Sequence, residues 1–186
     1  EESALLRLFT PIAKLYTAKT CLAITSEVVE CFGGAGYVED AGISHLLRDA
    51  QVFSIWEGTT NVLSLDLLRA VEKENAFPPF LQFVRERIDT FKNFGPEVEA
   101  LKQACSELQN YLGYATKEGP DFVQGGARQL AYSFARTFAA TLLLEFAEKT
   151  QDARAAETAR RWCRRGLVSL LHVNGARREA SRDLLN

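Results

Sequence analysis

Residues 30–61 read ECFGGAGYVEDAGISHLLRDAQVFSIWEGTTN, and three short patterns within them decide the fold. In chain order these are GGAGY at residues 33–37, LRDA at residues 47–50 and IWEGTTN at residues 55–61. The first pattern is typical of a helix end and the third of a helix start. The third also places one carboxylate, Glu57, beside a glycine, where a ligand can approach the backbone closely.

A helix is predicted before the glycines, over residues 11–32. Thr10 supplies the cap, Pro11 suits the first helical position, and apolar residues recur at near-helical spacing. Gly33 and Gly34 then stop the pattern, as expected for a helix terminator.

Residues 33–42 are expected to form a loop, because their glycines leave little to hold a regular element together. A short helix is predicted over residues 43–49. Thr59 and Thr60 can both cap the next helix, which ends in the charged residues 72–74.

Two prolines within residues 75–79 prevent that helix from continuing into the following one. We therefore predict a boundary between residues 1–74 and a helical extension, residues 75–186. Helices are expected in the extension over residues 80–91, 96–112, 129–149 and 153–172, with residues 113–126 at least partly a loop. The helix over residues 129–149 is the most apolar and should be the buried centre of a bundle. No strand pattern is present, so the predicted fold class is all-α, an up-and-down helical bundle followed by a second helical bundle.

The composition, 47% hydrophobic and 25% charged over 186 residues, excludes a disordered chain. No apolar run reaches the roughly 18 residues that a membrane helix needs, so no transmembrane segment is predicted. The acidic start, Glu1 and Glu2, fits neither a signal peptide nor a transit peptide and indicates a piece of a longer protein.

The cysteines lie far apart and have only two histidines to help them, so their spacing does not suggest a metal site or a disulfide framework. We expect no metal, and buried apolar thiols in a reducing compartment instead. The four cysteines are Cys21, Cys31, Cys105 and Cys163.

The net charge is −2, but acidic residues outnumber basic ones up to Glu74 and the balance reverses beyond it. The later basic residues include Arg160, Arg161, Arg164, Arg165, Arg177, Arg178 and Arg182. Two interpretations stay open: such a run binds phosphates or an acidic surface in some proteins and forms a solvated helix face in others.

The residues alone also leave two interpretations of Glu57. A carboxylate held beside Trp56 in a partly apolar pocket would have a raised pKa and suit a general base. Alternatively, Glu57 is an acid at a helix start that interacts with the helix dipole, and the local sequence favours this structural role. The glycines at residues 33–36 follow a helix rather than a strand, which argues against a Rossmann fingerprint.

Taken together, in this order and at these separations, the three patterns resemble the C-terminal helical domain of the flavin-dependent acyl-CoA dehydrogenases. The resemblance covers roughly residues 4–70. The remainder matches only as a helical extension of the kind carried by very-long-chain and AidB-like members. The tryptophan of residues 55–58 and the segment at residues 37–40 are closer to the AidB-like branch.

The resemblance implies a role for each residue of the third pattern. Glu57 would be the base that removes the α-proton of an acyl thioester while the β-hydrogen leaves as hydride to FAD. The thioester carbonyl would accept hydrogen bonds from the Glu57 backbone N–H and a flavin ribityl hydroxyl. Gly58 would lie against the substrate, and Thr59, Thr60 and Asn61 would contact the FAD phosphates and ribose.

The resemblance further implies that Glu30, Gly33 and Gly34 contact the adenine end of FAD from a neighbouring subunit. Glu30 departs from the family pattern, since a carboxylate replaces the usual glutamine amide. Arg69 matches an arginine near the substrate pocket, or it lies on a bundle surface. Trp56 shapes the pocket or belongs to the core.

We therefore expect a fragment of an enzyme that oxidises acyl-CoA to 2,3-enoyl-CoA and passes electrons to an electron-transfer flavoprotein. It would form a homodimer or homotetramer, and it would be intracellular, mitochondrial in a eukaryote and cytoplasmic otherwise. The alternative is an AidB-like flavoprotein whose basic C-terminal region binds DNA, with weak or no dehydrogenation. The extension could instead be an oligomerisation or membrane-surface module. Arg48 and Asp49 are expected to form a structural ion pair or cap.

Overall fold

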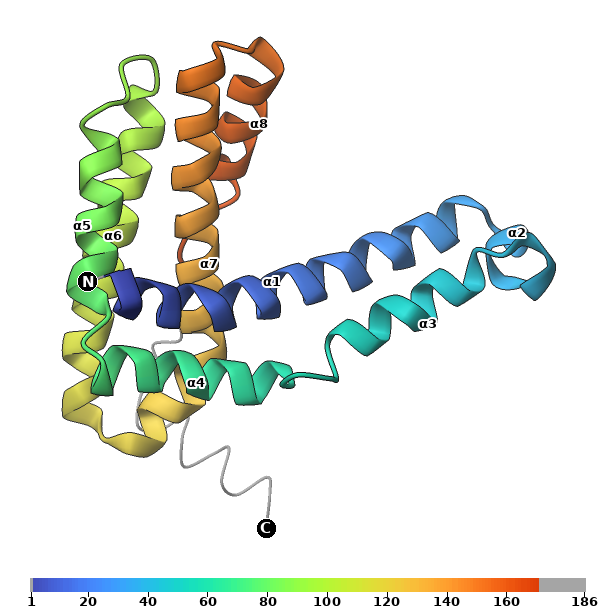
Figure 1. Ribbon diagram of the computed structural model, residues 1–186, viewed down its shortest axis with the longest axis horizontal. Helices are drawn as coiled ribbons and strands as arrows, with labels where there is room; N and C mark the ends of the chain where they lie inside the picture. Colours follow the sequence, from blue (N-terminus) through green and yellow to red (C-terminus); the bar gives the residue numbers. More distant parts are fainter. Residues whose placement is uncertain (1, 171–186) are drawn as a thin grey trace.

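The computed structural model describes residues 2–170, and every regular element in that range is helical. In Figure 1, α5, α6, α7 and α8 form an upright group, with α1 and α4 lying across it. The elements in chain order are α1 (Glu2–Cys31), α2 (Gly34–Tyr37), η1 (Glu39–Ala41), α3 (Ser44–Phe53), α4 (Thr60–Lys73), α5 (Phe77–Ile88), α6 (Gly95–Glu118), α7 (Pro120–Thr150) and α8 (Ala153–Arg164). The helical class predicted from the sequence is confirmed.

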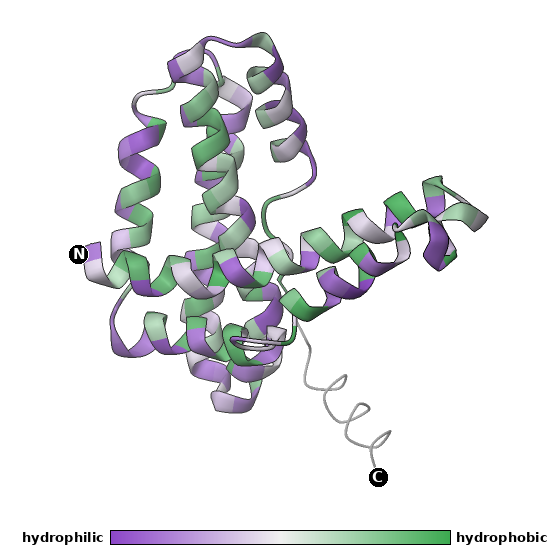
Figure 2. Cartoon of the chain, turned by 45° about the vertical axis from the view of Figure 1, so that its right-hand side comes forward, coloured by the Kyte–Doolittle hydropathy of each residue, from purple (hydrophilic) through white to green (hydrophobic). Residues whose placement is uncertain are grey.

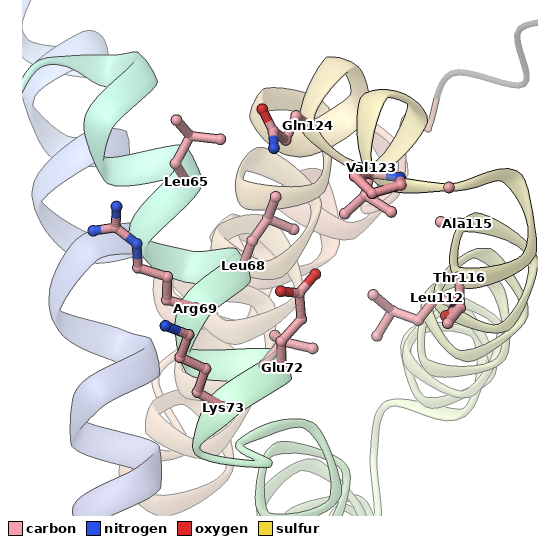
Figure 3. A pocket seen from close by; sticks show the side chains of 13 residues that line it. Leu65, Leu68, Arg69, Glu72, Lys73, Leu112, Ala115, Thr116, Val123 and Gln124 are labelled. Carbon is pink, nitrogen blue, oxygen red and sulfur yellow. Dashed lines mark hydrogen bonds between the residues drawn. The ribbon is translucent and has the colours of Figure 1, made fainter.

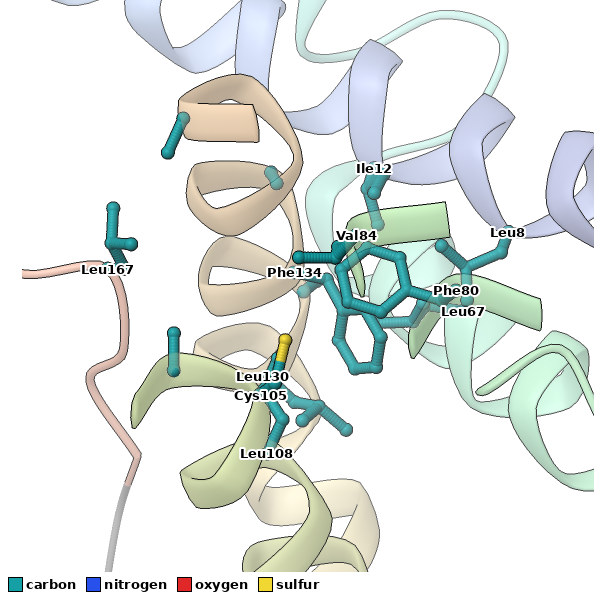
Figure 4. Packing of buried hydrophobic residues seen from close by; sticks show 14 of the residues in the cluster. Leu8, Ile12, Leu67, Phe80, Val84, Cys105, Leu108, Leu130, Phe134 and Leu167 are labelled. Atoms are coloured by element: carbon teal, nitrogen blue, oxygen red, sulfur yellow. The ribbon is translucent and has the colours of Figure 1, made fainter. Parts of the chain in front are cut away.

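Helix α7 is the centre of the packing, as predicted for residues 129–149. It touches α1, α4, α5, α6 and α8. Figure 4 shows Leu130 and Phe134 of α7 among buried side chains of the surrounding helices. One contiguous cluster of buried residues therefore joins residues on both sides of the predicted boundary, including Leu8, Ile12, Leu67, Phe80, Val84 and Leu108.

Helix α1 begins earlier than predicted, because Pro11 lies inside the helix and not at its first position. Proline removes one backbone hydrogen bond from a helix interior. Here Pro11 is itself buried next to Ile12, and the Thr10 hydroxyl donates to the Leu6 carbonyl oxygen (2.7 Å). Burial of this face thus outweighs the local preference for a helix start. The predicted end is confirmed, since α1 stops at Cys31.

The chain beyond Ala18 leaves the bundle, and α1 residues 19–31 project from it together with α2, η1 and α3 (Figure 1). We call this projection the arm. Figure 2 shows hydrophobic stretches along it. Its exposed large apolar residues are Ile24, Val28, Phe32, Tyr37, Val38, Leu46, Val52 and Phe53. No helix of residues 2–170 is both long and apolar enough to cross a membrane.

The loop predicted over residues 33–42 contains two short helical turns, α2 and η1, and the short helix after it continues to Phe53. The break predicted at residues 75–79 is confirmed: α4 ends at Lys73 with Asn75 in the left-handed region (φ 50°), and α5 begins at Phe77. The two prolines lie in the first turn of α5, where their missing N–H groups cost nothing.

The loop predicted over residues 113–126 is wrong. Gly113, Gly125 and Gly126 all lie inside helices, and α6 and α7 are separated only at Gly119 (φ 93°). A Cβ added at Gly126 would stand 1.8 Å from the Tyr111 hydroxyl oxygen. This glycine therefore serves a close approach of two helices and not a turn.

The last helix is shorter than predicted, because α8 ends at Arg164 and Gly166 follows with φ 80°. The chain then runs back along α7, where the Ser169 N–H donates to Ser133 Oγ (3.1 Å). His172, Arg177, Arg178 and Arg182 lie outside the described residues.

The cysteine prediction is right for half of the residues. All four cysteines are free, and Cys105 and Cys163 are buried, which raises the pKa of each thiol to about 11. Cys21 is half-buried, and Cys31 is exposed at the end of α1, because this part of the helix lies on the arm and not in the core.

A charged pair fixes α1 on α4. The Arg7 guanidinium donates two hydrogen bonds to the Asp66 carboxylate (2.6 and 2.5 Å), and its Nε lies 3.1 Å from Glu74 Oε1. Hydrogen bonding from Arg7 lowers the pKa of Asp66. Two parallel N–H···O bonds make this pair geometrically specific.

Substitution of neighbouring glycines in α7 should have opposite effects. Gly126→Ala is expected to lower the free energy of unfolding by about 1–3 kcal/mol, since the methyl group collides with Tyr111. Gly125→Ala, which meets no atom within 4 Å, should raise it by about 0.5–1 kcal/mol through helix propensity. Urea unfolding followed by circular dichroism measures both. Equal effects of the two substitutions would contradict the close α6–α7 approach.

Asp66→Asn should destabilise the fold in a pH-dependent way. Because the folded-state pKa of Asp66 is lowered, its contribution is present above the ordinary aspartate pKa and is lost as pH falls through the lowered pKa. We expect a loss of about 0.5–1 kcal/mol at neutral pH, since both side chains are partly exposed. Thermal unfolding of parent and variant across the acidic range checks this, with Glu72→Gln on the same helix as control. A constant difference at all pH values would refute it.

Candidate functional site

The candidate site is the turn between α3 and α4, which lies at the root of the arm (Figure 1). The chain leaves α3 through further turns, in which the N–H groups of Ile55 and Trp56 both donate to the Val52 carbonyl oxygen (2.9 and 3.2 Å). Thr59 then occupies the N-cap position of α4, as predicted, but its hydroxyl makes no capping hydrogen bond. Glu57 therefore sits between a helix C-terminus and a helix N-terminus.

Lys14 of α1 holds this turn. Its ammonium donates to three backbone carbonyl oxygens, those of Phe53 (2.8 Å), Trp56 (2.6 Å) and Gly58 (2.9 Å). Charged donors make the stronger hydrogen bonds in proteins, and a cation is favourable at a helix C-terminus. Lys14 was not predicted from the sequence. Its signal is a lysine three residues after Pro11 and four before Ala18, both of which face the core.

The backbone at the centre of the turn is unusual. Glu57 adopts φ 56° and Gly58 φ 115°, so two successive residues lie in the left-handed region. Glutamate pays for this conformation in free energy, whereas glycine does not. A Cβ at Gly58 would also stand 3.0 Å from Leu63 Cδ2. Residue 58 is therefore restricted to glycine by both conformation and space.

The turn presents a row of unbonded donors. Within the described part of the chain, the backbone N–H groups of residues 57–62 donate no hydrogen bond, and the first bonded one is Leu63, to the Thr59 carbonyl (2.9 Å). The last three of these groups are the orphan donors of a helix start. The helix dipole adds positive potential at this end of α4, which makes the row suited to an anion.

The side chains of the turn are open to solvent. Glu57 is exposed, and Trp56 is 56% exposed. Residues 2–170 alone therefore do not enclose Glu57 and Trp56 in an apolar pocket, and the two interpretations of Glu57 stay open. Ile55, also 56% exposed, extends the same uncovered apolar surface.

Glu30, Gly33 and Gly34 lie at the far end of the arm, and the structure does not bring them to Glu57 (Figure 1). All three are exposed, and Gly33 adopts φ 55° with no atom within 4 Å of where a Cβ would be. Arg48 forms a structural ion pair as expected, but with Glu39: its two N–H groups donate at 2.8 and 2.9 Å. This pair lowers the pKa of Glu39.

Arg69 lies elsewhere. It lines a cleft of about 720 Å³ between α4 and the junction of α6 and α7, with Leu65 and Glu72 on its own helix (Figure 3). Glu57 does not line this cleft. The opposite wall includes Leu112 and Val123. Asn61 is exposed in the first turn of α4, next to the row of free N–H groups.

Two family models match the chain. The model described as acyl-CoA dehydrogenase, C-terminal domain, matches residues 1–72. The model described as acyl-CoA dehydrogenase 11 C-terminal domain-like matches residues 75–184.

Two curated relatives span most of this chain. Acyl-CoA dehydrogenase family member 11 of Caenorhabditis elegans is 41% identical over 172 residues, which are 87% of this chain and 28% of that protein. The putative acyl-CoA dehydrogenase AidB of Escherichia coli (strain K12) is 40% identical over 135 residues, 72% of this chain and 25% of that protein. The chain thus spans about a quarter of the length of these relatives.

A solved structure agrees with the fold. The crystal structure of Caenorhabditis elegans ACDH-11 in complex with C11-CoA is similar at a TM-score of 0.88 and 38% identity, over 99% of this chain and 33% of that one. The chain therefore belongs to the acyl-CoA dehydrogenase family and corresponds to its C-terminal helical domain followed by a helical extension.

Proposed function

We propose that this chain is part of a flavin-dependent enzyme that oxidises an acyl-CoA thioester to its 2,3-enoyl product, with Glu57 as the base for the α-proton. The supporting observation is the turn at residues 57–62, which offers a carboxylate and a row of unbonded N–H groups in one segment. Removal of the α-proton leaves negative charge on the thioester oxygen. Donors fixed near that oxygen lower the barrier.

The substrate class is supported by the relative that was solved in complex with C11-CoA. Gly58 would lie against the thioester, because it has no side chain to keep the substrate from the turn. Arg69 is proposed as a further substrate contact. It lines an open cleft with apolar walls, but it lies in the third turn of α4, roughly 14 Å along the helix from Thr60.

The residues fit FAD. Thr59, Thr60 and Asn61 would hold its phosphates and ribose at the start of α4, where free N–H groups and the helix dipole favour an anion. Gly33 and Gly34 would receive the adenine end of FAD in a neighbouring subunit, since their backbone is open to close approach. Glu30 is exposed beside them, and as a carboxylate it accepts but does not donate. Bound FAD supplies the hydride acceptor.

This chain spans only about a quarter of the length of its relatives, so we expect residues 1–186 alone to be inactive. A carboxylate base without a hydride acceptor performs no redox chemistry. We infer a homodimer or homotetramer, supported by the exposed apolar residues of the arm. We further propose that electrons pass to an electron-transfer flavoprotein. The free cysteines suit an intracellular location, mitochondrial in a eukaryote and cytoplasmic otherwise.

Glu57→Gln in the full-length protein should slow flavin reduction by about 10²–10⁴-fold, because the amide cannot accept the α-proton. Anaerobic bleaching of the flavin by acyl-CoAs of graded chain length measures this. Glu99→Gln, which changes an exposed carboxylate on α6, is the control and should react like the parent. The proposal fails if no chain length bleaches the flavin or if Glu57→Gln reacts as fast as the parent.

A second candidate function is supported by α8 and the residue after it. Residues 153–165 carry five arginines and one glutamate, a net charge of +4, and Arg161, Arg164 and Arg165 are exposed. We propose as the alternative that this surface binds DNA in an AidB-like flavoprotein with weak or no dehydrogenation.

The DNA alternative predicts binding that weakens steeply with salt. Replacing Arg161, Arg164 and Arg165 by Gln should reduce the slope of log K against log salt by about one per phosphate contact removed. A gel-shift titration of the full-length protein at several salt concentrations checks this, with Lys102→Gln on α6 as control. Absence of a shift at low salt would dismiss this candidate.

A further inference from the structure

Lys14 contacts the turn in an unusual way, because its three acceptors belong to three different peptide groups. The Phe53 carbonyl ends α3, the Trp56 carbonyl precedes Glu57, and the Gly58 carbonyl follows it. Lys14 is 39 to 44 residues away from them in sequence. The ammonium thus lies on the α1 side of the turn and draws the carbonyls of the Trp56–Glu57 and Gly58–Thr59 peptides toward α1.

The orientation of these carbonyls fixes the orientation of the neighbouring N–H groups. In a planar trans peptide the C=O and the N–H of one group point in opposite directions. Because the Trp56 carbonyl points at Lys14, the Glu57 N–H points away from α1. Likewise, because the Gly58 carbonyl points at Lys14, the Thr59 N–H points away from α1. Both N–H groups are among those that donate no hydrogen bond in the described chain.

The arrangement is held against a conformational preference. Glu57 has φ 56°, which a non-glycine residue rarely adopts without support. Rotating the Trp56–Glu57 peptide by about half a turn would return φ to the negative range. The same rotation would turn the Trp56 carbonyl outward in place of the Glu57 N–H. A donor would then be replaced by an acceptor on the side where a ligand approaches.

We propose that Lys14 is a positioning residue that keeps the Trp56–Glu57 peptide in its strained orientation, so that the Glu57 N–H faces the substrate together with its carboxylate. The inference rests on the proposed function of Glu57. It adds that this function depends on a cation of α1 that does not touch the substrate. The ammonium also polarises the bonded peptides, which strengthens their N–H groups as donors.

The test compares two α1 variants in the full-length flavoprotein. Lys14→Met should lower the rate of flavin reduction at saturating acyl-CoA by about 10–10³-fold, as for loss of a fixed oxyanion donor, with a smaller change in the substrate concentration at half-saturation. Arg7→Met breaks another α1 contact with α4, so it should lower the melting temperature but leave the reduction rate within about twofold of the parent. Lys14→Arg, which keeps the charge, should recover part of the lost rate.

The outcomes separate the inference from the function on which it rests. If Glu57→Gln reduces the flavin as fast as the parent, the proposed function fails. If Glu57→Gln is slow but Lys14→Met reacts like the parent, or if Arg7→Met is as slow as Lys14→Met, only the positioning role fails. Should Lys14→Met not fold, Lys14→Gln keeps an uncharged donor group and most of the side-chain packing, and the same split between rate and half-saturation is expected of it.

Discussion

The packing of α7 is the constraint on which the rest of the structure depends. Its 31 residues include a broad buried face with Leu130, Phe134 and Leu144, so the helix needs cover from several neighbours, whereas Leu142 and Phe146 remain exposed. Helices α5, α6 and α8 supply part of that cover, and α1 and α4 supply the rest. Burial of each large apolar side chain contributes about 1.5–3 kcal/mol. The N-terminal half of α1 is held in place for this reason, and with it Lys14.

The same helix serves two environments. Up to Ala18, α1 presents a buried face that includes Leu8, Ile12 and Leu15, and beyond it the helix enters the arm, where Ile24 is 57% exposed. Lys14 stands just before this change. At the edge of a core, a lysine usually buries its aliphatic stem and keeps its ammonium in polar surroundings. The packing of α1 in the core therefore fixes the position at which the Lys14 ammonium meets the turn.

Proline, glycine and asparagine predicted helix ends correctly at some positions. At other positions the same residue types lie inside helices. Asn75 and the prolines after it separate α4 from α5 as expected, since no continuous helix is compatible with them. Pro11 and Gly126 are residues typical of helix ends, but both lie within helices. Tertiary contacts there outweigh an unfavourable helix propensity of about 1–3 kcal/mol. Periodicity cannot show that a glycine is needed for the approach of Tyr111 from another helix.

The candidate site was predictable only in part, for a related reason. Glu57 stood out through three patterns in register, whereas local chemistry alone favoured a structural acid. The role of Lys14 could not be predicted, because its partners are backbone carbonyls. Every residue has a backbone carbonyl, so no residue type in the turn indicates the contact. The exposure of Trp56 could not be predicted from the sequence either, since it depends on which distant residues of the fold pack against the turn.

The turn between α3 and α4 lies between the negative end of one helix dipole and the positive end of another. A cation bound at the negative end therefore stabilises the turn, whereas a carboxylate there would not. Helix α3 ends here with its negative pole and α4 begins here with its positive pole, within residues 53–60. Lys14 binds the carbonyls on the α1 side, including that of Phe53 at the end of α3. The unbonded N–H groups of α4 are left on the other side. An anion, or a carbonyl on which charge is developing, therefore meets the positive pole without competition from the negative one.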